Sequence, residues 1–149
     1  MVKVQTEDFD VGMVLAAMRH GNPSIGAMVS FVGLVRDLND NASVTTLTLE
    51  HYPDMTEKSL QAIVDQAKHR WELLDVVVIH RVGTLKPTDQ IVLVVVTSAH
   101  RQAAFLACEF VMDYLKTQAP FWKKETSPQG AHWVEAKTSD DEAQARWTQ

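Results

Sequence analysis

Apolar residues spaced three and four positions apart predict two long helices. The first follows Asp54, and Glu57 stands three residues later as in a capping box. Its expected core positions are Leu60, Ile63, Val64, Ala67 and Trp71. The second is expected over 100–116, with Thr97 or Ser98 as its cap. Its core candidates include Phe105, Leu106, Met112 and Leu115.

Two shorter helices are expected near the chain ends. One covers 11–19 and is ended by the Gly and Pro of 20–23. The other starts at Ser139, which forms a capping-box pattern with Glu142, and ends near Trp147.

Runs rich in β-branched residues predict buried central strands over 75–82 and 91–98, joined by a turn with Pro87 and Asp89. A strand over 27–36 carries Gly33, which marks a bulge or a close approach. An exposed loop over 37–43 separates it from a strand over 44–52, so the two are compatible with a hairpin. Short strands over 121–126 and 131–136 flank the turn at 127–130.

Short turns join neighbouring strands more often than helices do, which favours an α+β fold with a mainly antiparallel sheet over a doubly wound parallel one. The length of 149 residues and the 46% hydrophobic content suit one domain over 1–149. The formal charge of -5 argues against nucleic acid as the main partner. The apolar stretch 11–18 is far shorter than the roughly 20 residues of a membrane-spanning helix, so a cytoplasmic protein is expected.

The single cysteine, Cys108, lies within the apolar run AFLACEFVM. One cysteine cannot form an internal disulfide or a cysteine metal cluster. A buried core thiol is therefore favoured over a nucleophile. His51 and His80 lie on strands with apolar neighbours, and a structural imidazole is the favoured interpretation for both.

Cationic side chains at the ends of predicted elements are the remaining candidates for chemistry. The chain contains no phosphate loop, dinucleotide glycine fingerprint, zincin histidine pair or Gly-x-Ser-x-Gly elbow. His100 and Arg101 fall at the start of the second long helix, where the helix dipole disfavours positive charge. A bound phosphate or carboxylate would explain this conflict. Side chains that point into solvent, or that pair with an acid such as Asp89, are the alternative.

Lys116 closes the same helix, and Lys123 and Lys124 follow after the turn TQAPFW. Strand alternation places Lys123 and Lys124 on opposite faces, so one can enter a cleft while the other stays solvated. A lysine near other cations and partly desolvated has a lowered pKa and can act as a base or an amine nucleophile. Spacing alone favours ordinary surface lysines.

Five segments together resemble the MoaE family, the large subunits of molybdopterin synthase. They are FVGLVR (31–36), LEHYPDMTEK (49–58), HRVGTLKPTD (80–89), TSAHR (97–101) and MDYLKTQAPFWKKE (112–125). The resemblance runs in order from about residue 25 to residue 147. It implies an α/β hammerhead fold with additional antiparallel strands.

The resemblance also implies a reaction. Family members place two sulfurs on cyclic pyranopterin monophosphate and so make the dithiolene of molybdopterin. The sulfur arrives as a thiocarboxylate at the Gly-Gly tail of a small ubiquitin-like, MoaD-like subunit. Two large subunits form a homodimer with a small subunit at each end, a heterotetramer, and the transfer requires no metal or other cofactor. A sulfur supplied by the tail agrees with an inert Cys108.

Residue by residue, the resemblance implies that Lys116 is the principal catalytic residue, as a base or a transient covalent partner, with Lys123 assisting. It assigns substrate binding to both lysines and to Leu34, Val35, Arg36, His100, Arg101, Lys124 and Glu125. Phe31 and Met112 would pack beside this region. Two positions depart from the family: Leu34 stands where some relatives carry lysine, and Thr88 stands in a turn that is often Pro-Gly. A module that docks a ubiquitin-like tail without catalysis remains the alternative function.

Overall fold

The computed structural model describes residues 1–39, 42–43, 46–128, 130–134 and 137–148. Its main sheet has the strand order β1-β6-β8-β2. The inner strands β6 (Asp75–Arg81) and β8 (Gln90–Ser98) are antiparallel and almost wholly buried. β2 (Ala27–Leu34) pairs antiparallel with β8 at one edge, and β1 (Val2–Gln5) pairs parallel with β6 at the other. Strands covered on both faces need continuous apolar sequence, which β6 and β8 provide.

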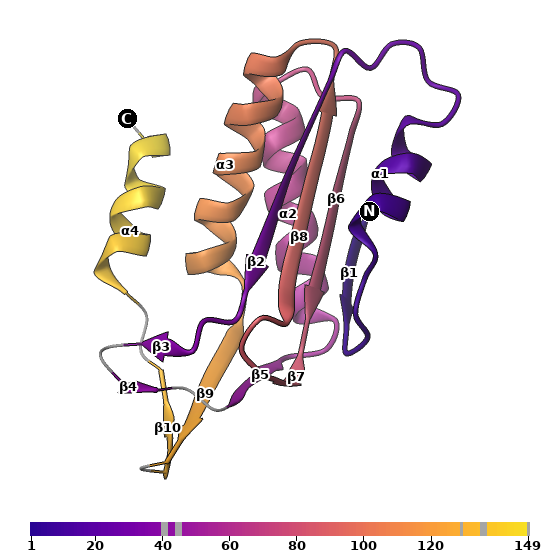
Figure 1. The fold of residues 1–149 in the computed structure, drawn as a ribbon. Coiled ribbons are helices and arrows are strands. Elements are labelled where there is room, and N and C mark those ends of the chain that lie inside the picture. The colour runs from indigo at the N-terminus through magenta and orange to yellow at the C-terminus, as the bar shows by residue number, and fades with distance from the viewer. Residues whose placement is uncertain (40–41, 44–45, 129, 135–136, 149) are drawn as a thin grey trace.

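Helices cover both faces of this sheet (Figure 1). α2 (Met55–Arg70) and α3 (Arg101–Gln118) lie on one face, and α1 (Val11–Arg19) lies on the other. Side chains of β6 and β8 alternate between the two cores. Those facing α2 and α3 are Val76, Val78, Val92, Val94 and Val96, and those facing α1 are Val77, Ile79, Leu93 and Val95. No helix in the described part of the chain has the length and apolar character needed to cross a bilayer.

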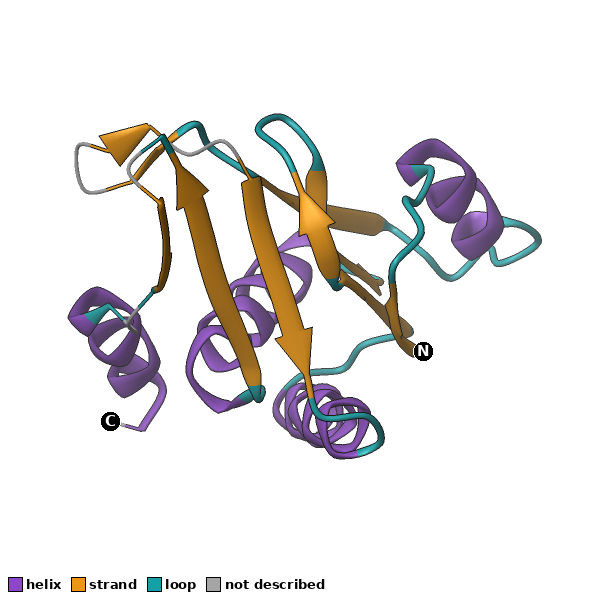
Figure 2. Cartoon of the chain, turned by 90° about the horizontal axis from the view of Figure 1, so that it is seen from below, coloured by secondary structure: helices purple, strands orange, loops and turns teal. Residues whose placement is uncertain are grey.

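A second sheet, with the order β10-β9-β5-β7, is antiparallel and lies beyond the lower end of the main sheet in Figure 1. Figure 2 shows the same region from below. Its strands are β5 (Thr46–His51), β7 (Gly83–Leu85), β9 (Phe121–Ser127) and β10 (Gly130–Trp133). Two short strands, β3 (Leu38–Asn39) and β4 (Ala42–Ser43), pair nearby. α4 (Thr138–Ala145) and a 3₁₀ turn (Arg146–Thr148) follow beside α3.

The α+β class with mainly antiparallel strands is confirmed. Both long helices and both short ones form close to their predicted limits. The backbone N–H of Asp54 donates to Glu57 Oε2 over 2.7 Å, as the capping-box pattern predicted. Cys108 is buried, also as predicted.

Several local predictions are wrong. The hairpin of 27–36 with 44–52 does not form, because β2 pairs with β8 while β5 pairs with β7 and β9. Of the predicted strands 44–52 and 131–136, residues 44–45 and 135–136 lie outside the described part of the chain. α3 begins after His100, and Ser98 only accepts the His100 N–H, over 3.4 Å. α4 begins after Lys137 without a side-chain cap, so Ser139 does not cap it. Phe105, a core candidate, is 60% exposed.

Two strands were not expected at all. β1 lies in the first residues of the chain, where four residues are too few for a clear alternation, and it is held by its pairing with β6. β7 lies within the predicted connection between the central strands and pairs with β5. Both strands depend on a distant partner strand, which local sequence does not reveal.

Gly33 combines the two features expected of it. The register between β2 and β8 shifts between Gly33 and Leu34. A Cβ atom at position 33 would lie 2.8 Å from Cγ1 of Val92, closer than real side chains approach. The bulge ends β2 and turns Leu34, Val35 and the following Arg36 away from the regular ladder.

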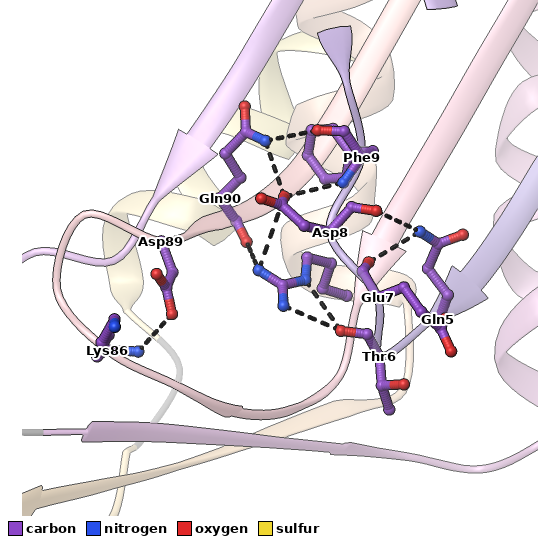
Figure 3. A network of polar contacts seen from close by, with 9 residues as sticks. Gln5, Thr6, Glu7, Asp8, Phe9, Lys86, Asp89 and Gln90 are labelled. Atoms are coloured by element: carbon purple, nitrogen blue, oxygen red, sulfur yellow. Dashed lines mark hydrogen bonds and ion pairs between the residues drawn. The ribbon is translucent and has the colours of Figure 1, made fainter.

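The turn at 86–89 holds Val35 from both sides of its peptide. Val35 N–H donates to the Asp89 carbonyl, and Thr88 N–H donates to the Val35 carbonyl, each over 2.9 Å. The turn itself is closed by the Asp89 carboxylate, which accepts from Lys86 N–H over 3.0 Å (Figure 3). Val35 is therefore fixed by backbone contacts that do not depend on its side chain.

Arg81 anchors the start of β8 next to this turn. Its guanidinium donates to the Thr6 carbonyl over 3.0 and 3.1 Å and to the Gln90 carbonyl over 3.1 Å. The Gln90 side chain in turn donates to Asp8 Oδ1 over 2.8 Å (Figure 3). The N-terminal segment, the end of β6 and the start of β8 are thus tied together.

Thr88 occupies the left-handed region with φ 77°, a conformation that favours glycine. A non-glycine residue in this region costs about 1 kcal/mol. We expect Thr88→Gly to raise the melting temperature by about 2 to 4 °C in thermal unfolding followed by circular dichroism. Thr84→Gly, placed within β7, should instead lower it. A lower melting temperature for Thr88→Gly would contradict strain at this turn.

Candidate active site

One cavity of about 160 Å³ lies where the second sheet meets the lower end of α3. Its wall combines elements from the whole chain: the end of β2, β5, β8, the end of α3, β9 and the segment before α4. The lining residues are Leu34, Val35, Arg36, Leu47, Ile91, Lys116, Lys123, Glu125, Val134 and Lys137. Four of them are cationic and one is acidic, which suits an anionic ligand.

Lys116 and Lys123 meet in this cavity from different elements. Lys116 lies in the last turn of α3, where a cation interacts favourably with the helix dipole. Lys123 lies on β9 opposite Leu49 of β5 and is largely buried. The prediction that Lys123 and Lys124 point to opposite faces is confirmed, because Lys124 lies over the Trp133 ring at 5.7 Å and does not line the cavity.

The pKa of Lys123 is lowered from 10.5 to about 8. Burial is the largest cause, because the charged amine loses its hydration. The charge of Lys116 and a hydrogen bond with its side chain lower the pKa further, while Asp140 raises it and Lys137 lowers it by smaller amounts. At a pKa of about 8, roughly a tenth of Lys123 is neutral at pH 7 and able to accept a proton, far more than for an ordinary lysine.

The β2 end supplies Leu34, Val35 and Arg36 to the opposite wall. Leu34 is 52% exposed and Val35 is buried beneath the clamp at 86–89. Glu125, two residues after Lys123 on the same face of β9, is buried and lines the cavity as well. These residues and the two lysines form one group, as the resemblance implied.

His100 and Arg101 do not join this group within one chain. They lie at the first turn of α3, whereas Lys116 lies at its last turn. Arg101 and Lys116 are fifteen positions apart in α3, which corresponds to roughly 22 Å along the helix axis. A single anion cannot contact both ends, so an anion site made of Arg36, Arg101 and Lys116 in one chain is ruled out.

Phe31 and Met112 also lie outside the cavity lining. Phe31 is 41% exposed on β2, and Met112 packs against the core between the main sheet and α2 and α3. Neither contacts the cavity described above.

Lys137 and Val134 are lining residues that sequence reasoning missed. Lys137 is the N-cap residue of α4 and is exposed at the cavity rim. The residues around it, AKTSDD, carry no motif or helical periodicity that would distinguish it from a surface lysine. Only the return of the chain past β9 brings Lys137 beside Lys123.

Cys108 and His80 have no role in the cavity. Burial raises the pKa of the Cys108 thiol to about 11, so it is not a reactive thiolate. Burial lowers the pKa of His80 to about 3, and its ring stacks on Phe121 with centroids 3.8 Å apart. His80 Nδ1 lies 2.8 Å from the Arg81 carbonyl, which can only accept, so Nδ1 carries the proton. The structural interpretation of His80 is confirmed.

Metal binding has no evident site in the described ranges, where no group of three or more His, Cys, Asp or Glu side chains is arranged to hold an ion. The charged groups that line the cavity are three amines, a guanidinium and the Glu125 carboxylate, which can bind anions, transfer protons and, in a neutral lysine, act as a nucleophile.

Comparison with known proteins identifies close relatives. The family model described as MoaE protein matches residues 4–118. The molybdopterin synthase catalytic subunit of Ralstonia nicotianae (strain ATCC BAA-1114 / GMI1000) is 60% identical over 146 residues, which cover 98% of this chain and 83% of that protein.

Solved structures share the fold. The molybdopterin biosynthesis MoaE protein from Burkholderia ambifaria MC40-6 has a TM-score of 0.86 and 54% identity, covering 100% of this chain and 98% of that one. A chain in the complex of subunits 1 and 2 of molybdopterin-converting factor from Helicobacter pylori 26695 has a TM-score of 0.74 over 91% of each chain. At 21% identity the latter likeness concerns the fold alone.

The low pKa of Lys123 can be tested directly. We expect the ¹³C-dimethylated amine of Lys123, assigned with Lys123→Arg, to titrate near pH 8 in NMR spectra. Lys116→Met should raise this pKa, because it removes the neighbouring positive charge. Lys68→Met, on the exposed side of α2, is the matched control and should leave it unchanged. Titration of Lys123 near its ordinary 10.5 would show that the amine is not buried.

Proposed function

The chain belongs to the MoaE protein family, and we propose that it is the catalytic subunit of a molybdopterin synthase. It transfers sulfur from the C-terminal thiocarboxylate of a small ubiquitin-like subunit to cyclic pyranopterin monophosphate and forms the molybdopterin dithiolene. The observation that carries the proposal is the convergence of Lys116, Lys123 and Arg36 in one cavity. A domain that only docked a tail would not require a partly neutral lysine beside other cations.

The cavity residues have different roles, some in attracting anions and others in proton or acyl transfer. Arg36 and Lys137 line the cavity and attract the phosphate and the anionic end of the tail. The thiocarboxylate sulfur bonds to the substrate carbon as the cyclic phosphate ester opens at that carbon, which leaves the tail joined to the substrate as a thioester. Lys123, with its pKa of about 8, can take a proton from the water that hydrolyses this thioester and frees the tail as a carboxylate. Lys116 is the principal catalytic residue, either as a base or as an amine that takes the acyl group of the tail. Positioning and fixed charges supply much of the acceleration.

A small partner subunit is part of this proposal. The relatives' name, catalytic subunit, implies a further subunit in their enzymes. The cavity wall combines cations with the apolar Leu34, Leu47 and Ile91. An extended glycine tail with a terminal anion matches such a wall, because it lacks side chains and carries its charge at the end.

A second copy of the chain gives His100 and Arg101 a role. Because α3 is rigid, these residues can bind the phosphate only at the cavity of another chain. β2 is an edge strand, and it exposes Phe31 and Leu34, while the neighbouring α3 exposes Phe105. Exposed apolar side chains on adjoining elements mark an interaction surface. We assign this surface to the homodimer, which places the start of α3 from one copy near the cavity of the other.

Lys116→Ala tests the catalytic assignment. We expect the variant to fold and to bind the small subunit, but to lose at least about a hundredfold in dithiolene formation, the usual contribution of a positioned proton-transfer group. The assay combines the chain, thiocarboxylated small subunit and pyranopterin substrate, with Lys68→Ala as control. Normal turnover by Lys116→Ala would remove Lys116 from the mechanism. If the wild-type chain binds the small subunit but shows no turnover, the docking module is supported instead.

Mixing two inactive variants tests the shared site. Lys116→Ala and Arg101→Ala should each be inactive alone. If each cavity takes Lys116 from one copy and Arg101 from the other, mixed dimers contain one intact site. Random exchange then restores about a quarter of wild-type activity, from the symmetry of the dimer. Absence of any recovery, with exchange verified by mass spectrometry, would contradict the shared site.

A further inference from the structure

The C-terminal end of α4 is fastened to α3 by charged and polar contacts. Arg146 Nη2 lies 2.8 Å from Glu109 Oε1 and 2.7 Å from Asp113 Oδ2. The indole Nε1–H of Trp147 donates to the same Asp113 oxygen over 2.7 Å. The Thr117 hydroxyl also bonds the Gln144 side chain. Asp113, only 15% exposed, therefore receives two donors from the end of the chain.

The Trp147 ring completes an aromatic cluster with α2 and α3. It lies edge-on to Trp71 and Phe110, with centroids 5.7 and 5.4 Å apart, and Phe110 is fully buried. Arg70 of α2 donates to the Trp147 carbonyl over 2.6 Å and lies over the Phe110 ring at 4.8 Å. We call Arg146, Trp147 and Asp113 the clasp.

α4 is a short helix on the surface of the fold. None of its eight residues is buried. A helix of this length is not stable alone in water, because nucleation outweighs so few hydrogen bonds. Its place beside α3 therefore depends on the contacts at its C-terminal end.

The N-terminal end of α4 reaches the cavity. Lys137, its N-cap residue, lines the wall, and Asp140 in its first turn acts electrostatically on Lys123. Eight helical residues span roughly 12 Å, so a rigid α4 carries the position of the clasp to the cavity rim.

We propose that Arg146 and Asp113 are positioning residues, which hold α4 so that Lys137 lines the cavity, Asp140 stays near Lys123, and Lys123 is shielded from water. No residue of the clasp lines the cavity, so it acts only through α4. The catalytic consequence rests on the proposed function. The placement of α4 and the effect on the pKa of Lys123 are independent of the proposed function.

The charges around Lys123 set the expected effect of opening the clasp. Lys116 faces it from α3, Lys137 and Asp140 from α4, and His80, which is neutral, from β6. Glu125 on β9 and Arg36 after β2 line the same cavity. Releasing α4 removes one cation and one acid and admits water. Because lost hydration is the largest cause of the low pKa, we expect that pKa to rise from about 8 toward 10.5.

Arg146→Ala is the primary test, measured on the full chain by NMR titration of dimethylated Lys123 and by hydrogen exchange. We expect a raised Lys123 pKa and amide exchange over 137–145 at least about tenfold faster, as for a locally opened segment. Arg146→Lys should restore both in part, since it keeps a cation near Asp113. Arg19→Ala, an exposed arginine at the end of α1, is the matched control.

Asp113→Asn tests the same contact from α3 and serves if Arg146→Ala does not fold. It should produce the same direction of change, and the double variant should add little to either single one. An unchanged Lys123 titration in both variants would overturn the proposal, as would fully additive effects.

A turnover assay separates the proposed sulfur-transfer function from the positioning role of the clasp. In the sulfur-transfer assay we expect a loss of roughly ten- to a hundredfold in kcat/KM for Arg146→Ala, as for displaced site residues, with an alkaline shift of the pH profile. If the wild-type chain shows no sulfur transfer, the proposed function fails while the titration still decides on the clasp. If the Lys123 pKa moves but the pH profile does not, Lys123 does not act in the rate-limiting step and the positioning role in the reaction is overturned.

Discussion

The packing of α3 on the main sheet is the contact on which the rest of the structure depends. Ala104, Ala107, Phe110 and Val111 are fully buried and lie against the valines of β6 and β8. Small and large side chains alternate, so the helix approaches the sheet closely and cannot slide without opening voids. Because the helix is fixed along its length, its two ends are fixed as well: Lys116 beside the second sheet, and His100 and Arg101 at the far end.

Around Lys116 the chain gathers several cationic side chains. β9 brings Lys123 opposite Leu49 of β5, and the segment after β2 adds Arg36. Holding these cations together costs free energy, because each disfavours the charged form of the others. Proteins retain such arrangements where an anion or a proton transfer requires them. Two of these cations follow directly from local structure: Arg36 comes after the Val35 peptide held by the turn at 86–89, and Lys137 is the N-cap residue of α4.

The sequence alone predicted the elements whose signal is local. The apolar spacing of α2, the continuous β-branched runs of β6 and β8 and the alternation that separates Lys123 from Lys124 each depend on residues within one turn or one strand. Cys108 was identified as a core thiol by its apolar neighbours alone. The family resemblance then named the lysines, which spacing had left as ordinary surface residues.

Only the tertiary structure decided which elements meet. Strand pairing is set by burial and by partners distant in the chain, so the apparent hairpin of β2 and β5 gave way to two separate sheets, and β1 and β7 became visible only beside their partners. Lys137 had no local signal, and it reaches Lys123 because α4 folds back onto α3. The length of α3 was predicted from sequence, but only the structure shows that it keeps Arg101 and Lys116 too far apart to bind one anion within a single chain.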